Sequence, residues 1–448
     1  MIQEIPIFGD YLPHGRFYPT DETPELIFQD GKNAAHYFSI DKTTLFRNLM
    51  FVGAAGTGKT NVINQVVKQL RSPVSSAPDD CYFALIFDTK ADYVTHRDFF
   101  RPGDYIIGNS RQFRSRSANW NIFAEVLADG DAPEDYEPNA KEISAILFEG
   151  RGSKTQPFFA NAARDIFAYT IIYFIRRAQE QGGDWINNLN NESLCKFLRN
   201  YGPRDLSKFF HIYPDMRFLL TYFGDGTSNQ ALGVFAELHS MLADCFQGIF
   251  CRKSTLKDSF SIRQAVRQKQ NRSVFIEYDM ALGHILTPMY RLLVDLALKE
   301  ALSTLASPGR FYLILDELKL LPKLTHLQDA LNYGRSHQVA VVGGIQTVDQ
   351  LYSTYGEHQA QEILEGFGSL IALKTTDHAS REYISKRFGY NVVGYRYYST
   401  SQSPLDRERE GYVVEHRHQQ KLRRGEAIVG LASQSEPFLF QFDRDRFA

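Results

Sequence analysis

This chain of 448 residues has few cysteines, almost no net charge and no long hydrophobic run. The cysteines form no C-x-x-C pair and have no histidine at zinc-finger spacing, so we expect reduced thiols and neither disulfides nor a cysteine-based zinc site. The net charge of −2 gives no overall basic field. Any binding of nucleic acid must therefore use local basic patches or an assembled ring. The four cysteines are Cys81, Cys195, Cys245 and Cys251.

The lack of long apolar segments argues against a membrane span. The longest run, IFAYTIIYFI at 166–175, is too short to cross a bilayer and predicts a buried helix. The N-terminal stretch MIQEIPIFGDYLPHGRFYP has the features of neither a signal peptide nor a membrane anchor. We therefore expect a soluble cytoplasmic protein whose length and 43% hydrophobic content allow one large core or two smaller ones.

What the chain does contain is a phosphate-binding sequence, GAAGTGKT, at 53–60. It fits G-x-x-x-x-G-K-[ST] at every fixed position, and it lies between an apolar run typical of a buried strand and a segment with helical periodicity. Glycines let consecutive N–H groups converge on phosphate oxygens. The lysine reaches the β- and γ-phosphates and the threonine hydroxyl completes a Mg²⁺ shell. The predicted nucleotide-binding residues are Gly53, Ala55, Gly56, Thr57, Gly58, Lys59 and Thr60.

A second set of residues favours hydrolysis of the bound ATP. Asp316 and Glu317 follow the apolar run FYLIL, where one carboxylate can hold Mg²⁺ and the other can polarise water. Gln346 follows VAVVGGI, and its amide could contact the γ-phosphate or position water. Arg335 ends a helical segment; it either supplies positive charge to a neighbouring subunit or is a solvated arginine at a helix end.

Short β-rich runs alternate with helical patterns, which predicts an α/β fold with a mainly parallel sheet. From 135 to 265 only helical periodicity is found. We therefore predict an all-α domain at 135–265, inserted in a nucleotide-binding domain formed by 1–134 and 266–448. Its polar loop at 179–193 is expected to be mobile, and 397–426 is expected to form an exposed hairpin or arm. The expected strands are 48–53, 82–88, 104–107, 273–278, 311–316, 339–345, 369–374 and 427–431.

In this order, the motifs resemble those of the coupling ATPases of bacterial conjugation and type IV secretion, the TraG/TraD/TrwB-like family. The resemblance is carried by VGAAGTGKT, by IFDTKADY, by SANWNIFAE at 117–125, and most strongly by the segment 315–356. It extends over nearly the whole chain from about residue 35 onward.

The resemblance implies a RecA-like P-loop NTPase that assembles as a homohexamer, with ATP and Mg²⁺ bound between subunits. Asp316 and Glu317 would be the Walker B pair, Arg335 the trans-acting arginine and Gln346 the sensor. The implied partners are DNA, a relaxase or nucleoprotein substrate, and a type IV secretion channel or membrane adaptor. Family members usually begin with transmembrane helices, so this chain would be a soluble variant, at most peripheral at the inner face of the cytoplasmic membrane. Some relatives carry a lysine where this chain has His358.

Two other functions compete with a coupling motor. One is a duplex-DNA translocase of the HerA/FtsK kind, and the other is a substrate-docking adaptor whose ATP site controls assembly. The loop 149–159 offers Arg151 and Lys154 beside two phenylalanines, which suits contact with DNA phosphates and bases. The same loop can equally be an ordinary surface turn.

Overall fold

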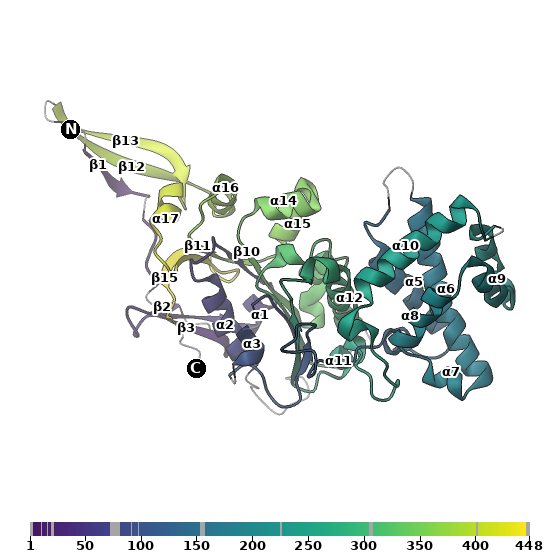
Figure 1. Cartoon of the computed structure of the whole chain (residues 1–448). Helices are drawn as coiled ribbons and strands as arrows, with labels where there is room; N and C mark the ends of the chain where they lie inside the picture. Colours follow the sequence, from purple (N-terminus) through teal and green to yellow (C-terminus); the bar gives the residue numbers. More distant parts are fainter. Residues whose placement is uncertain are drawn as a thin grey trace.

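A nine-stranded sheet forms the centre of the molecule (Figure 1). The computed structural model describes residues 3–9, 11–15, 17–18, 22–71, 81–90, 92–96, 98–152, 157–224, 226–303, 308–399 and 402–444. The seven strands from β11 to β7 are parallel, and β14 and β15 extend the sheet in antiparallel fashion. In spatial order the strands are β15 (Phe438–Gln441), β14 (Glu426–Gly430), β11 (Ser369–Leu373), β5 (Leu49–Val52), β10 (Val339–Ile345), β9 (Arg310–Leu315), β6 (Tyr82–Asp88), β8 (Arg272–Glu277) and β7 (Tyr105–Ile107).

Each strand expected from the sequence is found within one or two residues of its predicted bounds. β15 was not predicted. The prediction of a mainly parallel α/β sheet is confirmed.

Helices cover both faces of the sheet, because alternate strand residues point to opposite sides. Leu49 and Phe51 face the core shared with α1 (Lys42–Leu45), α2 (Lys59–Leu70) and α3 (Asp92–Thr95). Met50 and Val52 face the core on the other side. That second core is built with α4 (Ile122–Val126), α11 (Ile262–Gln268), α12 (Gly283–Leu302), α13 (Leu327–Tyr333), η4 (Leu318–Leu320), α14 (Asp349–Tyr355), α15 (Glu357–Glu365) and α16 (His378–Arg387).

A body of helices lies beside the sheet (Figure 1). Every described element between β7 and α11 is helical, and its apolar residues continue the core on the α12 side of the sheet. α6 alone among the described helices is long and apolar enough to cross a membrane, and 67% of its apolar window is buried in the fold. The prediction of a buried helix at 166–175 is confirmed. The helices of this body are α5 (Pro133–Phe148), α6 (Phe158–Gln181), α7 (Asp184–Asn187), α8 (Asn191–Asn200), α9 (Pro203–His211), η2 (Pro214–Tyr222), α10 (Asn229–Cys245) and η3 (Gly248–Cys251).

The expectation of a loop at 179–193 is wrong. The segment contains the end of α6, the short helix α7 and the start of α8. Asn190 is buried and caps α8 by accepting a hydrogen bond from the Ser193 N–H at 3.0 Å. Asn191 is also buried and donates to the carbonyls of Trp120 and Phe250 at 2.9 and 3.1 Å. These asparagines satisfy buried backbone groups, which explains how a polar sequence packs inside the fold here.

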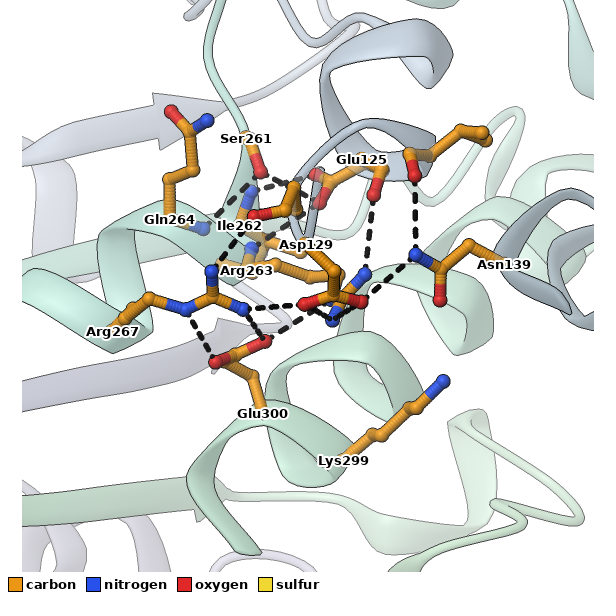
Figure 2. Close-up of polar contacts among 12 residues, drawn as sticks. Glu125, Asp129, Asn139, Ser261, Ile262, Arg263, Gln264, Arg267, Lys299 and Glu300 are labelled. Atoms are coloured by element: carbon orange, nitrogen blue, oxygen red, sulfur yellow. Dashed lines mark hydrogen bonds and ion pairs between the residues drawn. The ribbon is translucent and has the colours of Figure 1, made fainter. Parts of the chain in front are cut away.

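A buried charge network joins α4, α11 and α12, where the helical body meets the sheet (Figure 2). The Glu300 carboxylate is fully buried and accepts hydrogen bonds from Arg263 at 3.1 Å and from Arg267 at 2.8 and 2.9 Å. Both arginines also bind Asp129, at 2.7–2.8 Å. Glu125 accepts hydrogen bonds from the Ser261 hydroxyl and from the first N–H groups of α11. Two arginines are thereby neutralised by carboxylates inside the fold.

Two small sheets complete the chain. β1 (Gln3–Phe8), β12 (Tyr390–Ser399) and β13 (Gln402–Tyr412) form an arm that extends away from the central sheet (Figure 1). The hairpin predicted at 397–426 is therefore present, but it begins earlier, and α17 (His416–Lys421) follows it. The other small sheet consists of β2 (Phe17–Tyr18), β4 (Tyr37–Asp41) and β3 (Pro24–Gln29), and packs on α2.

Candidate nucleotide-binding site

The phosphate-binding sequence forms a loop between β5 and α2. Gly56 and Gly58 have φ angles of +78° and +111°, which favour glycine because a Cβ atom would clash with the backbone. A Cβ on Gly53 would lie 2.9 Å from the Cβ of Leu373 and 2.9 Å from the Thr57 hydroxyl oxygen. The glycines therefore allow both the turn and its close packing against β11.

Residues far along the chain hold this loop in place. The Gly53 N–H donates to the Ile345 carbonyl at 3.2 Å, and the Ala54 N–H donates to the Lys374 carbonyl at 3.0 Å. On the other side, the Gly425 N–H donates to the Thr57 carbonyl at 2.8 Å. The loop is thus bound to the ends of β10 and β11 and to the start of β14.

The two predicted carboxylates lie against the loop, because β9 is parallel to β10 and β10 is parallel to β5. The Thr60 hydroxyl donates to Asp316 Oδ2 at 3.0 Å. Gln346 Nε2 donates to Glu317 Oε2 at 2.7 Å, and Lys59 Nζ lies 3.6 Å from the same oxygen. The structure therefore brings together Lys59, Thr60, Asp316, Glu317 and Gln346, as the sequence pattern predicted.

Three charged atoms in this cluster are buried without a hydrogen-bond partner among the described residues: Lys59 Nζ, Asp316 Oδ1 and Glu317 Oε1. Burial lowers the pKa of Lys59, against the opposing effect of the Glu317 and Asp316 carboxylates. Buried charges without partners are costly. An anionic phosphate chain at Lys59 and a divalent cation at Asp316 would satisfy them, so these residues fit a bound Mg²⁺–nucleotide.

The cluster opens into a cleft of about 540 Å³ that contains residues to which the sequence assigned no role. Lys90 Nζ donates to the Thr60 hydroxyl at 3.1 Å; it follows the predicted strand 82–88, but its chemistry alone gave no role. Arg424 also lines the cleft and was not predicted. The glycine in LRRGE was the available sequence signal for a turn at this point. Gly425 has a φ of +78° and turns the chain back onto the phosphate loop. The remaining unpredicted residues of the lining are Ala54, Asn61, Thr89, Met280, Lys319 and Leu320.

Arg335 and His358 lie elsewhere. Arg335 is exposed in η5 (Gly334–His337), just before β10, whereas Gln346 follows the opposite end of that strand. Its side chain therefore lies at the amino ends of the parallel strands, whereas the phosphate loop of its own chain lies at their carboxyl ends. His358 is 91% exposed in the first turn of α15, with Nδ1 3.4 Å from Glu362 Oε1.

The residues suggested for DNA contact receive little support. Arg151 forms an ion pair with Asp244 at 2.8 Å, and only 15% of its side chain is exposed. It also donates to the Leu147 carbonyl at 3.3 Å. Lys154 lies outside the described residues. The guanidinium of Arg151 is thus already used inside the helical body.

The match to a protein family covers most of the chain. Residues 35–434 match the family model described as the type IV secretion-system coupling protein DNA-binding domain. The chain belongs to this family. Among curated proteins it is 22% identical, over 382 residues, to the coupling protein TraD of Escherichia coli (strain K12). That match covers 82% of this chain but 48% of TraD, so the chain spans about half the length of this relative.

Solved structures of coupling proteins share the fold. The unbound monoclinic form of the bacterial conjugative coupling protein TrwBdeltaN70 superposes with a TM-score of 0.72 and 22% identity, covering 94% of this chain and 90% of that one. TrwB in complex with ADP and Mg²⁺ gives 0.71 and 21%, with coverages of 96% and 91%. VirB4 of Thermoanaerobacter pseudethanolicus is more distant, at 0.55 and 12%, with coverages of 96% and 98%. The RecA-like P-loop fold expected from the sequence is therefore confirmed.

Proposed function

We propose that this coupling-protein family member is a Mg²⁺-dependent ATPase that acts on DNA during conjugation or type IV secretion. The observation that carries this proposal is the convergence of Lys59, Thr60, Asp316, Glu317 and Gln346 in one cleft. TrwB, which shares the fold, has been solved with ADP and Mg²⁺ and with a non-hydrolysable ATP analogue.

The geometry supports a role for each residue. Thr60 and Asp316 would hold Mg²⁺, which on binding neutralises charge on the phosphates. Lys59 lines the cleft, with its Nζ 3.6 Å from Glu317 Oε2; with nucleotide bound, its ammonium would turn to the β- and γ-phosphates and release its contact with Glu317. Glu317 then orients the attacking water and accepts its proton at the carboxylate. Gln346 holds that carboxylate through its Oε2 atom.

We further propose a homohexameric ring in which Arg335 acts on the nucleotide of the neighbouring subunit. Arg335 is exposed at the amino ends of the parallel strands, away from its own phosphate loop, and this position supports a role in trans. In this arrangement 1–134 and 266–448 form the motor domain and 135–265 a separate helical domain. DNA, a relaxase or nucleoprotein substrate, and a secretion channel at the inner face of the cytoplasmic membrane are the proposed partners.

The test is ATP hydrolysis by purified protein, measured with and without single- and double-stranded DNA. Lys59→Ala should reduce turnover by at least about 100-fold, in the range found when one charge-stabilising donor is removed. Lys68→Ala is the matched control, since Lys68 lies on the same helix but pairs with Asp98 on the surface, at 3.6 Å. Glu317→Gln should retain ATP binding and lose turnover by about 10²–10⁴-fold.

Each part of the proposal can fail separately. Normal turnover in Glu317→Gln would remove the carboxylate from the mechanism. Hydrolysis that is indifferent to DNA, in a protein that stays monomeric with ATP, would refute the DNA motor but leave an ATPase.

A further inference from the structure

Three side chains with metal-binding atoms meet beside β15, and none of them lines the nucleotide-binding cleft. His14 lies in a segment that pairs with Leu439, Asp30 directly follows β3 and pairs with Phe442, and His36 precedes β4. One ligand atom from each of the three residues lies within 4.8 Å of the other two. Three separate stretches of backbone thus bring two imidazoles and one carboxylate together.

Asp30 is held with one oxygen directed at this cluster. Its Oδ1 accepts hydrogen bonds from the Lys32 and Asn33 N–H groups at 2.8 and 3.2 Å, which fixes the carboxylate. Its Oδ2 is buried and has no hydrogen-bond partner among the described residues, and only 1% of the side chain is exposed. A buried carboxylate oxygen left without a partner is expensive, so this atom indicates a missing ligand.

The histidines stand at distances that a metal ion can close. His14 Nδ1 lies 3.8 Å from Asp30 Oδ2, and the two imidazole rings are 6.3 Å apart between centroids. Zinc bonds of 2.0–2.2 Å in a tetrahedron place ligand atoms about 3.3–3.6 Å apart. The His14 side chain is 40% exposed, so its ring has room to turn toward an ion bound at Asp30 Oδ2. The Asn33 amide contacts His36 Nε2 at 3.2 Å and orients that ring.

We propose that His14, Asp30 and His36 bind a Zn²⁺ ion, with water in the fourth position. Two imidazoles and one carboxylate are a donor set that zinc accepts. An ion pair between protonated His14 and Asp30 would also neutralise the carboxylate, but it would leave His36 without a function in the cluster. The four cysteines do not take part.

The ion would attach the segment before β2 to the sheet edge. The Gly15 N–H already donates to the Leu439 carbonyl at 2.7 Å, and the Gly31 N–H donates to the Gln441 carbonyl at 2.9 Å. β15 leads in turn to Phe442, whose N–H donates to the carbonyl of Gly425 at 2.8 Å. Zinc at this position therefore stabilises the sheet edge that continues to the phosphate loop, independently of whether ATP is hydrolysed.

The test is zinc binding to the full chain, measured by competition with a chromogenic chelator after treatment with EDTA. Wild type should bind one Zn²⁺ per chain and melt at a higher temperature with zinc. His14→Ala and Asp30→Asn should weaken binding by at least about 100-fold, the upper end of what the loss of an outer-shell partner costs. Asn retains the oxygen that accepts the two backbone hydrogen bonds, and His14 is half-exposed, so both variants should fold. His211→Gln, on the exposed end of α9, is the control and should bind like wild type.

Cobalt substitution identifies the ligands. Co²⁺ in this site should show the visible absorption of a tetrahedral ion without a sulfur-to-metal charge-transfer band. Such a band would assign the ion to cysteines and overturn the proposal. It would also be overturned by wild-type affinity in His14→Ala or Asp30→Asn, or by wild-type protein that binds no zinc.

Discussion

Glu300→Gln tests whether the charge network between α4, α11 and α12 stabilises the fold. Glutamine preserves the volume of the side chain, so no cavity forms, but the two arginines then share only Asp129. Removing one partner of a buried ion pair costs about 3–5 kcal/mol. Because Asp129 remains, and Arg267 is 24% exposed, we expect a loss at the lower end of this range, about 3 kcal/mol in the free energy of unfolding.

The assay is thermal unfolding followed by circular dichroism. At roughly 1 °C per kcal/mol for a chain of this size, the melting temperature should fall by about 3 °C. Glu192→Gln is the control, since it breaks an exposed pair with Lys196 at 2.9 Å and should cost less than about 0.5 kcal/mol. If both variants melt within 1 °C of wild type, the network contributes nothing and the reasoning is wrong.

A second arm of the experiment isolates the pair. Arg267→Met alone should also be destabilising, because Glu300 is fully buried. The double variant Glu300→Gln/Arg267→Met should lose less free energy of unfolding than the sum of the two single losses. Each single change leaves one charge of the pair without its partner, and the double change removes both charges. Strict additivity would show that the two residues do not interact.

Further perturbations test the catalytic site and the surface. Gln346→Ala should lower ATP turnover by about 10²-fold and leave nucleotide affinity within a few-fold, because the amide holds the Glu317 carboxylate at 2.7 Å and so acts on the catalytic step; a large loss of affinity, measured by fluorescent-nucleotide titration, would contradict this. Arg335→Ala mixed with Lys59→Ala should recover part of the ATPase activity if the arginine acts in trans, and recover nothing if it acts in cis. The hydrogen bond to Glu142 raises the pKa of His326 above its ordinary value of 6.5, so its stabilisation is present below about pH 6.5 and is lost as the pH rises through the higher folded value; in melting curves across that range, His326→Gln should flatten the dependence, and an unchanged slope would exclude this histidine as its source.

The strands were predictable because their signal is local. β5, β6, β9, β10 and β11 consist only of buried residues, and each is followed by glycine or polar residues that line the cleft or hold the phosphate loop. Because these strands are parallel, their carboxyl ends lie together on one side of the sheet. The cluster around Lys59 followed from those two facts.

Long-range partners were not predictable in the same way. Nothing next to Asn191 in the sequence indicates that its amide binds the carbonyls of Trp120 and Phe250, so the segment was misjudged as a loop. Arg151 sits in a sequence suited to phosphate, but Asp244 occupies its guanidinium from 93 residues away. In both cases the contact that decides the structure joins residues far apart in the sequence, and the local composition does not predict it.

The strand order also has a consequence for biosynthesis. β5 lies between β10 and β11, and its first partner pair in β10 joins Leu49 to Val342, 293 residues later (342 − 49). At 5–20 residues per second a ribosome needs about 15–60 s to make that stretch. During this time the phosphate loop emerges without either of the strands that brace it. A nascent chain stalled before residue 339 should therefore be unable to bind nucleotide and should depend on chaperones to shield β5.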